Sequence, residues 1–292
     1  MLNPNIWRSQ QLEFHWQDLQ ISYHDQGEGP VLLLLHGLPG SSWDWHLIWP
    51  MLSGRFRLIA PDLPGCGDSA KPLLYDYRLA DQAAVIRDLL QHLQISDYQL
   101  IAHDYGAAVS WALLNDLTDP PRPSATSWLA PRITGNRNAF LWRERWLSGP
   151  SGEALRCLLS EGLYGRYLER LSGPDSMLPA QVVHDSWQLL CAHQGLQVLP
   201  QMLNYRYELP LASEWSTDGP PLPRLQIIRG EYDPLAFSLP ALAGAEIQWL
   251  KTGHFPHLEE PARLIALLHE FHAGTGLRHA RFENLRYPSG QD

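Results

Sequence analysis

Short apolar runs alternate with amphipathic stretches along the first half of the chain. Val31–Leu35 is apolar at every position and residues 57–60 repeat that character, which is typical of parallel strands covered on both faces. Within residues 82–93 the apolar side chains recur at helical spacing, and residues 98–102 form a further apolar run. This alternation predicts an α/β fold with a mostly parallel central sheet and helices on both of its faces.

Further segments extend the predicted sheet at both ends. Two short half-apolar segments near the N-terminus, residues 12–16 and 19–23, predict a hairpin. The remaining core elements follow from the same patterns: strands at 124–129, 225–229 and 246–250, and helices at 107–115 and 261–272.

Between the predicted strands at 124–129 and 225–229 the strand signal disappears. Aromatic-rich helical segments take its place and predict an inserted helical cap, with helices at 139–146, 152–171, 182–192 and 194–205. The expected organisation is a core of residues 1–129 and 214–274, a cap of residues 130–213 and a C-terminal tail of residues 275–292.

The composition narrows the classes of partner. The chain has 292 residues, 45% of them hydrophobic, and a net charge of -9. Nucleic acids and anionic membranes require a basic face, so we expect neither as a partner. The first residues carry charges and glutamines where a signal peptide needs an apolar run, and the three cysteines are widely spaced. These features favour a cytoplasmic protein and leave its oligomeric state open.

The segment Ala102-His103-Asp104-Tyr105-Gly106 joins a predicted strand to a predicted helix. The small residues Ala102 and Gly106 permit the sharp turn that a nucleophile elbow needs. Asp104 is then the nucleophile, and a carboxylate attacks carbon directly, leaving an ester that water must hydrolyse. On this segment alone, an aspartate that caps the following helix is an equally good interpretation.

Two further residues follow predicted strands in the order that an elbow nucleophile requires. Asp233 lies in the turn after residues 225–229, and His254 lies in the loop after residues 246–250. The carboxyl ends of parallel strands meet at one edge of a sheet, where open α/β folds hold their sites. We predict that His254 deprotonates water and that Asp233 orients and stabilises its imidazole.

Each of these assignments has a neighbouring alternative. His257 competes with His254, but it leads into a helix start, whereas His254 follows a glycine directly after the strand. Glu231 competes with Asp233, which lies deeper in the turn beside Pro234. We rank both alternatives lower on position.

A turn that contains two glycines, His36-Gly37-Leu38-Pro39-Gly40, follows the first buried strand. Its glycines allow the backbone to approach the nucleophile. We expect the backbone N–H groups of Leu38 and Tyr105 to form an oxyanion hole for hydrolysis of the aspartyl ester. A plain Gly/Pro turn is the alternative for this segment.

Together these motifs resemble the α/β-hydrolase superfamily over nearly the whole chain, and in particular its epoxide hydrolase and haloalkane dehalogenase branch. The matching segments are His36-Gly37-Leu38-Pro39, residues 62–69, the Asp104 elbow and Gly253-His254-Phe255-Pro256. The elbow, together with Asp233-Pro234 and Leu258-Glu259-Glu260-Pro261, is also similar to the mesoderm-specific transcript subgroup.

The resemblance implies a test of substrate class in the cap. Epoxide hydrolases use cap tyrosines to protonate the opening ring oxygen. Here Tyr205 and Tyr164 are the favoured candidates, with Tyr207 and Tyr167 as alternatives. Each of the four is also explained as a packing residue of the cap.

Haloalkane dehalogenases hold halide with a tryptophan directly after the nucleophile and often an asparagine after the His-Gly pair. This chain has Tyr105 and Leu38 at those positions, so a halide would need other donors, for which Trp142 and Trp187 in the cap are candidates. Fluoroacetate dehalogenases place an arginine after the nucleophile, and Tyr105 argues against that class as well.

These inferences predict a hydrolase that acts through a covalent aspartyl ester on a small, largely apolar substrate, with an epoxide as the first candidate. Water and that substrate are the expected partners, and the mechanism requires no metal and no organic cofactor. Haloalkane dehalogenation is the alternative reaction, and a ligand-binding receptor or pseudoenzyme is the alternative of another class. Substrate contacts are expected from His36, Tyr164, Tyr205, Trp142 and Trp187.

Overall fold

A computed structural model describes residues 3–116, 118, 121–134, 142–149, 152–209, 224–236, 242 and 244–273. At its centre is an eight-stranded sheet in the order β1-β2-β4-β3-β5-β6-β7-β8. The pairs β1–β2 and β2–β4 are antiparallel, and every other neighbouring pair is parallel. The predicted α/β architecture is confirmed.

The strands coincide with the apolar runs of the sequence to within a few residues. Their bounds are β1 Leu12–Trp16, β2 Leu19–Gln26, β3 Val31–Leu35, β4 Arg57–Pro61, β5 Gln99–His103, β6 Ala125–Leu129, β7 Arg224–Gly230 and β8 Glu246–Leu250.

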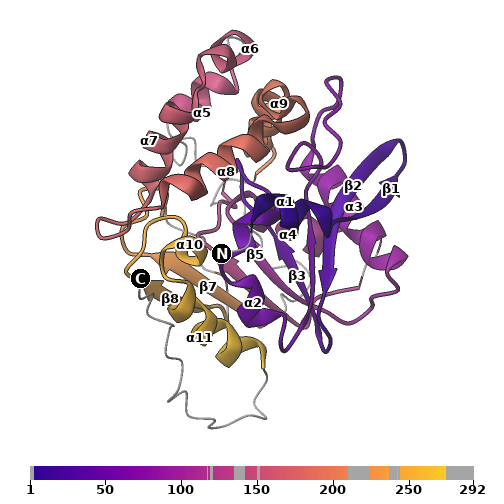
Figure 1. Cartoon of the computed structure of the whole chain (residues 1–292). Coiled ribbons are helices and arrows are strands. Elements are labelled where there is room, and N and C mark those ends of the chain that lie inside the picture. The colour runs from indigo at the N-terminus through magenta and orange to yellow at the C-terminus, as the bar shows by residue number, and fades with distance from the viewer. Residues whose placement is uncertain are drawn as a thin grey trace.

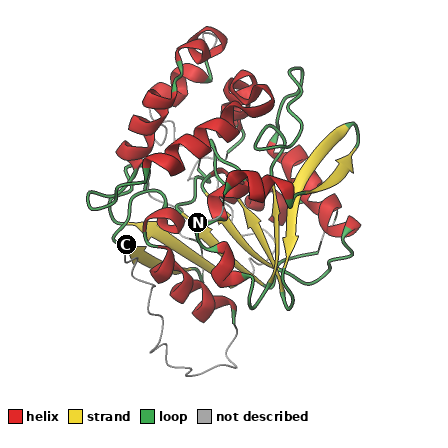
Figure 2. Cartoon of the chain, viewed as in Figure 1, coloured by secondary structure: helices red, strands yellow, loops and turns green. Residues whose placement is uncertain are grey.

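Helices cover both faces of the sheet, which explains why the central strands are apolar throughout (Figure 2). Leu33 and Leu35 of β3 pack into the hydrophobic cluster that includes residues of α3 and α4. Leu32 and Leu34 point to the opposite face, into a cluster with residues of α1, α2 and α11. These helices are α1 Pro4–Ser9, α2 Trp49–Leu52, α3 Leu79–His92, α4 Tyr105–Leu114 and α11 Pro261–His272.

Between β6 and β7 the chain leaves the sheet and forms a group of helices at one end of the molecule (Figure 1). We call this group the cap. Its α-helices are α5 Trp142–Leu147, α6 Gly152–Leu155, α7 Glu161–Leu171, α8 Ala180–Cys191 and α9 Gly195–Met202. Short 3-10 helices join them: η3 Arg156–Leu158, η4 Ala192–Gln194 and η5 Leu203–Tyr207.

One helix prediction within the cap is wrong. The segment 152–171 is not a single helix, because the chain extends at Leu159 and Ser160 before α7 begins. The Ser160 hydroxyl accepts a hydrogen bond from the Leu163 N–H at 3.4 Å, as an N-cap does. The start of the predicted helix at 139–146 and the predicted tail at 275–292 lie outside the described residues.

Loops at the carboxyl ends of the parallel strands bring distant residues together. Two further short helices lie in these loops: η1 Ser42–Trp45 after β3 and α10 Pro256–Glu259 after β8. In the part of the chain that the structure describes, no helix is both long and apolar enough to cross a bilayer.

Candidate active site

Asp104 lies between β5 and α4 in a strained backbone conformation, with φ 47° and ψ -111°. Such a conformation costs a non-glycine residue about 1–3 kcal/mol, so the surrounding structure must enforce it. Gly106 explains how the turn fits, because a Cβ atom there would lie 2.3 Å from the Leu35 carbonyl oxygen. The close approach of α4 to β3 therefore makes a sharp turn at the carboxyl end of β5, and Asp104 lies in this turn.

The two oxygens of the Asp104 carboxylate have different surroundings. The Leu38 N–H donates to Oδ2 at 3.0 Å, and His254 Nε2 lies 3.3 Å from Oδ1. The lack of a side chain at Gly37 lets the Leu38 turn lie this close to the nucleophile, since a Cβ atom there would lie 2.6 Å from His103 Nδ1. Asp104 is 1% exposed, so this arrangement is almost fully shielded from solvent.

The structure brings the three predicted triad residues together. The His254 Nδ1–H donates to Asp233 Oδ2 at 2.9 Å, and the Leu235 N–H donates to Asp233 Oδ1 at 2.8 Å. The imidazole therefore bridges the two aspartates through its two nitrogens, as a base and its orienting acid require.

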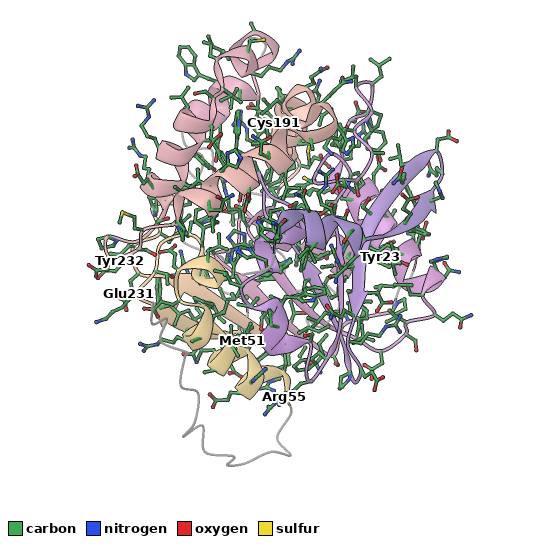
Figure 3. The ribbon with its side chains drawn as sticks, in the orientation of Figure 1. Tyr23, Met51, Arg55, Cys191, Glu231 and Tyr232 are labelled. Carbon is green, nitrogen blue, oxygen red and sulfur yellow. The ribbon has the colours of Figure 1, made fainter. Side chains whose placement is uncertain are left out.

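Neither alternative occupies these positions. Glu231 is exposed, and Figure 3 shows it at the edge of the molecule. His257 is fully buried behind the site, with its ring centroid 4.5 Å from that of His103. Burial and the neighbouring imidazoles hold the pKa of His257 well below its ordinary value.

Two residues that the sequence analysis did not single out hold the His254 loop in place. The His103 Nε2–H donates to the His254 carbonyl oxygen at 2.9 Å. The Glu259 carboxylate accepts the N–H groups of Gly253 at 2.8 Å and Phe255 at 3.0 Å, on either side of the histidine. Positioning residues therefore support the histidine on both flanks.

A buried arginine also contacts the nucleophile. Arg132, in the loop after β6, places Nε 3.4 Å from Asp104 Oδ1. Its Nη1 and Nη2 donate to both carboxylate oxygens of Glu144 in α5, at 3.1 and 2.6 Å. Glu144 in turn accepts the Tyr167 hydroxyl at 2.9 Å. This network ties the nucleophile to the cap, and neither periodicity nor a motif points to it.

These charges set the protonation states of the site. Burial would raise the pKa of Asp104, but Arg132 and His254 hold it well below its usual range. Burial would likewise lower the pKa of His254, but Asp233 and Asp104 raise it to about 10. The resting site is therefore an imidazolium between two carboxylates.

A small cavity lies over Asp104, between the core loops and the cap. Two of the four candidate tyrosines, Tyr164 and Tyr167, line it. Tyr205 is 1% exposed and packs its ring against that of Tyr105 at 4.6 Å. Tyr207 lies at the surface, 62% exposed.

The other residues expected to contact substrate lie elsewhere. His36 uses both ring nitrogens on the backbone, donating to the Gly37 carbonyl at 2.8 Å and accepting the Leu63 N–H at 3.0 Å. It thereby braces the turn that carries Leu38. Trp187 packs against the ring of Tyr164 at 5.7 Å. The Trp142 side chain lies outside the described residues.

Among the described residues, no group of three or more histidine, cysteine or acidic side chains is arranged to hold a metal ion. The polar groups around Asp104 pair with one another, as the triad and the Arg132–Glu144 pair show.

Comparisons with known proteins agree with this geometry. Residues 30–127 match the family described as the alpha/beta hydrolase fold. The human mesoderm-specific transcript homolog protein is 40% identical over 221 residues, which span 70% of this chain and 65% of that protein. A soluble epoxide hydrolase from Corynebacterium sp. (strain C12) is 39% identical over 101 residues, 34% of this chain and 35% of that protein.

The fold is also similar to that of solved structures. The crystal structure of ALR0039 from Nostoc sp PCC 7120 superposes with a TM-score of 0.78, covering 90% of this chain and 98% of that one. At 22% sequence identity this likeness bears on the fold alone.

Proposed function

From the premise that this chain belongs to the α/β-hydrolase superfamily, we propose that it hydrolyses small, largely apolar epoxides through a covalent ester on Asp104. A fold hosts many activities, so the proposal rests on the site. Its small-molecule substrate and water are the two reactants, and side chains and backbone N–H groups of the described residues act on them.

The observation that carries the proposal is the asymmetry of the Asp104 carboxylate. The Leu38 N–H holds Oδ2, while Oδ1 faces His254. The hydrogen bond to Oδ2 fixes the orientation of the carboxylate, and Oδ1, whose contacts to His254 and Arg132 are longer, is the oxygen that can attack. Because its pKa lies well below the usual range, Asp104 is ionised and ready to attack at neutral pH.

In the first step, Oδ1 attacks a ring carbon and the ring oxygen leaves with a proton. The Asp104 charge disappears on ester formation, and that charge is one of the causes that raise the pKa of His254. The imidazolium can then pass its proton to the group that protonated the ring oxygen and serve as a general base. This change explains how a histidine with a resting pKa of about 10 becomes competent when it is needed.

In the second step, His254 deprotonates water, which adds to the carbonyl carbon of the ester. The negative charge develops on Oδ2, where the Leu38 N–H already lies at 3.0 Å. The Tyr105 N–H, at the first position of α4, is a second donor that no intrahelical bond occupies. Collapse of this intermediate releases the diol and regenerates Asp104.

Two observations favour an epoxide over a halide. Tyrosine hydroxyls of the cap line the cavity, and a hydroxyl can protonate or hold an alkoxide oxygen. Tyr105 replaces the tryptophan with which dehalogenases bind halide.

Single turnover in heavy-oxygen water tests the proposal. With enzyme in excess over an epoxide, the water oxygen enters the Asp104 carboxylate, and the diol receives its oxygen from the enzyme. Mass spectrometry of the peptide that contains Asp104 detects the label. Label in the diol alone would contradict an ester, and release of halide from haloalkanes without turnover of any epoxide would replace the substrate class.

A further inference from the structure

Asp44 shares the active-site cavity with Asp104. It belongs to η1, the short 3-10 helix after the Leu38 turn, and it lines the cavity together with Tyr164 and Ser186 of the cap. Its carboxylate lies close to the turn, because a Cβ atom at Gly40 would come within 2.2 Å of Asp44 Oδ2. The cavity therefore contains two carboxyl groups, and the steps above use only one.

The surroundings of the two carboxyl groups differ. Asp104 has Arg132 at 3.4 Å and His254 at 3.3 Å. Asp44 forms no ion pair with any described residue, and the Ser41 backbone is the hydrogen-bonding partner of its carboxyl group. The titratable groups that act on Asp44 are acidic or neutral: Asp62, Asp104, Cys66 and Tyr164.

This environment favours the protonated form of Asp44. Burial, with Asp62 and Asp104 adding to it, raises the pKa of Asp44 well above its ordinary value, while the Ser41 hydrogen bond opposes the rise. The pKa values of the two carboxyl groups in one cavity are thus shifted in opposite directions. Two carboxyl groups whose pKa values are shifted in opposite directions can divide the roles of nucleophile and acid between them.

The tyrosines leave room for a second proton donor. The Tyr167 hydroxyl donates a hydrogen bond to the Glu144 carboxylate at 2.9 Å. Tyr205 packs against Tyr105, and Arg132, Asp104 and Glu144 all act on the pKa of its hydroxyl, but it is not among the described residues that line the cavity. Tyr164 is the favoured tyrosine that does line it, and its hydroxyl also interacts with Ser186.

We propose that the Asp44 carboxylic acid protonates the leaving oxygen, and that Tyr164 holds this oxygen with a hydrogen bond. This inference rests on the proposed epoxide hydrolysis. As Asp104 Oδ1 forms its bond to the ring carbon, the ring C–O bond breaks and its electron pair stays on oxygen, which takes the proton of Asp44. The Asp44 carboxylate recovers a proton from the His254 imidazolium by way of the new hydroxyl group. Neutral His254 then deprotonates water, and the two reactants sum to a diol.

The test measures ester formation by itself. In a His254→Gln background the ester accumulates, so its rate of formation can be followed by intact mass. Asp44→Asn keeps the size of the neutral acid but has no proton to transfer, and Asp44→Ser is a second variant if the first fails to fold. Asp185→Asn, in α8 but not among the described residues that line the cavity, is the matched control.

The substrates are a series of epoxides whose leaving oxygens differ in basicity. We expect Asp44→Asn to slow ester formation about 100-fold or more for the most basic leaving oxygen, and progressively less for weaker bases. Asp185→Asn should leave every rate within about twofold of its parent.

The outcomes separate the two proposals. Absence of ester from every epoxide with Asp44 intact would overturn the proposed function. Ester formation that Asp44→Asn leaves within about threefold of its parent would overturn the role of Asp44 alone. A penalty equal for all leaving oxygens would also overturn it, because a residue that only shapes the cavity affects each substrate alike.

Discussion

The two walls of the active-site cavity are built in different ways. On the core wall, each triad side chain is fixed by contacts of 2.8 to 3.4 Å to loops at the ends of strands. The cap wall consists of side chains from α7 and α8, chiefly Tyr164, Tyr167, Leu168, Val182 and Ser186. The sheet therefore fixes the reaction, while the cap shapes the space above it. The Arg132–Glu144 pair is one of the contacts that cross between the core and the cap, as is the hydrogen bond from the His254 N–H to the Leu171 carbonyl oxygen at 2.7 Å.

The core wall should give the largest effect on turnover. His254→Gln leaves the Leu38 N–H and Arg132 on the nucleophile, so Asp104 still attacks, but the ester has no base for its hydrolysis. We expect steady-state turnover to fall about 10³-fold while one equivalent of ester accumulates. Intact mass with and without substrate measures both. His184→Gln, at an exposed position of α8, is the control, and a variant that never forms ester would contradict this division of roles.

Removing the Arg132–Glu144 pair should lower stability in addition to removing a charge beside the nucleophile. Arg132→Met leaves the buried Glu144 carboxylate without its partner, at a cost of about 3–5 kcal/mol in the free energy of unfolding. The double variant with Glu144→Met should recover much of this loss, giving a coupling energy of about 0.5–3 kcal/mol. Urea unfolding of the four proteins completes the cycle. Strict additivity would mean that core and cap are energetically independent here.

The pKa of His254 reports the negative charges that surround its imidazole on the core wall. Burial lowers its pKa, while Asp233 and Asp104 raise it to about 10. Asp104→Asn removes one negative charge, so NMR titration of the imidazole should give a lower pKa. An unchanged value would mean that Asp104 does not act on the ring.

The same shift predicts how stability depends on pH. The folded-state pKa of His254 lies above the ordinary value of 6.5, so its stabilisation is complete below that pH and is lost as pH rises through about 10. Asp104→Asn should lose less stability over this interval than the unmodified chain, as measured by unfolding at several pH values.

Substitutions on the cap wall should have smaller effects on rate. Tyr164→Phe removes one hydrogen bond to the leaving oxygen and should lower kcat/KM for epoxides about tenfold. Tyr207→Phe, at the surface, should leave it unchanged. Equal effects of the two substitutions would place the substrate somewhere other than beside Tyr164.

Residue patterns located the core wall because it follows rules of order and position. Asp104, Asp233 and His254 each follow an apolar strand, and parallel strands place those ends together whatever the intervening sequence does. Leu38 follows the same rule, because it lies in the loop after β3, and its N–H lies 3.0 Å from the nucleophile. In these cases local pattern and global topology agree, so no knowledge of packing was needed.

The cap residues depended on packing that periodicity does not encode. Tyr205 and Tyr164 looked equivalent in sequence, yet Tyr205 packs on Tyr105 while Tyr164 lines the cavity. Arg132 and Glu144 meet only because α5 returns to the loop after β6, and neither lies in a recognisable motif. Asp44 did leave a signal, since it is a lone charge between two buried tryptophans, Trp43 and Trp45.

The positive φ angle of Asp104 makes position 104 one at which stability and chemistry favour different residues. Glycine would adopt that backbone conformation freely, whereas aspartate bears a cost of about 1–3 kcal/mol. Glycine, however, carries no nucleophile. A more stable backbone and a working nucleophile thus require different residues at position 104. The aspartate found there meets the requirement of the chemistry at the expense of stability.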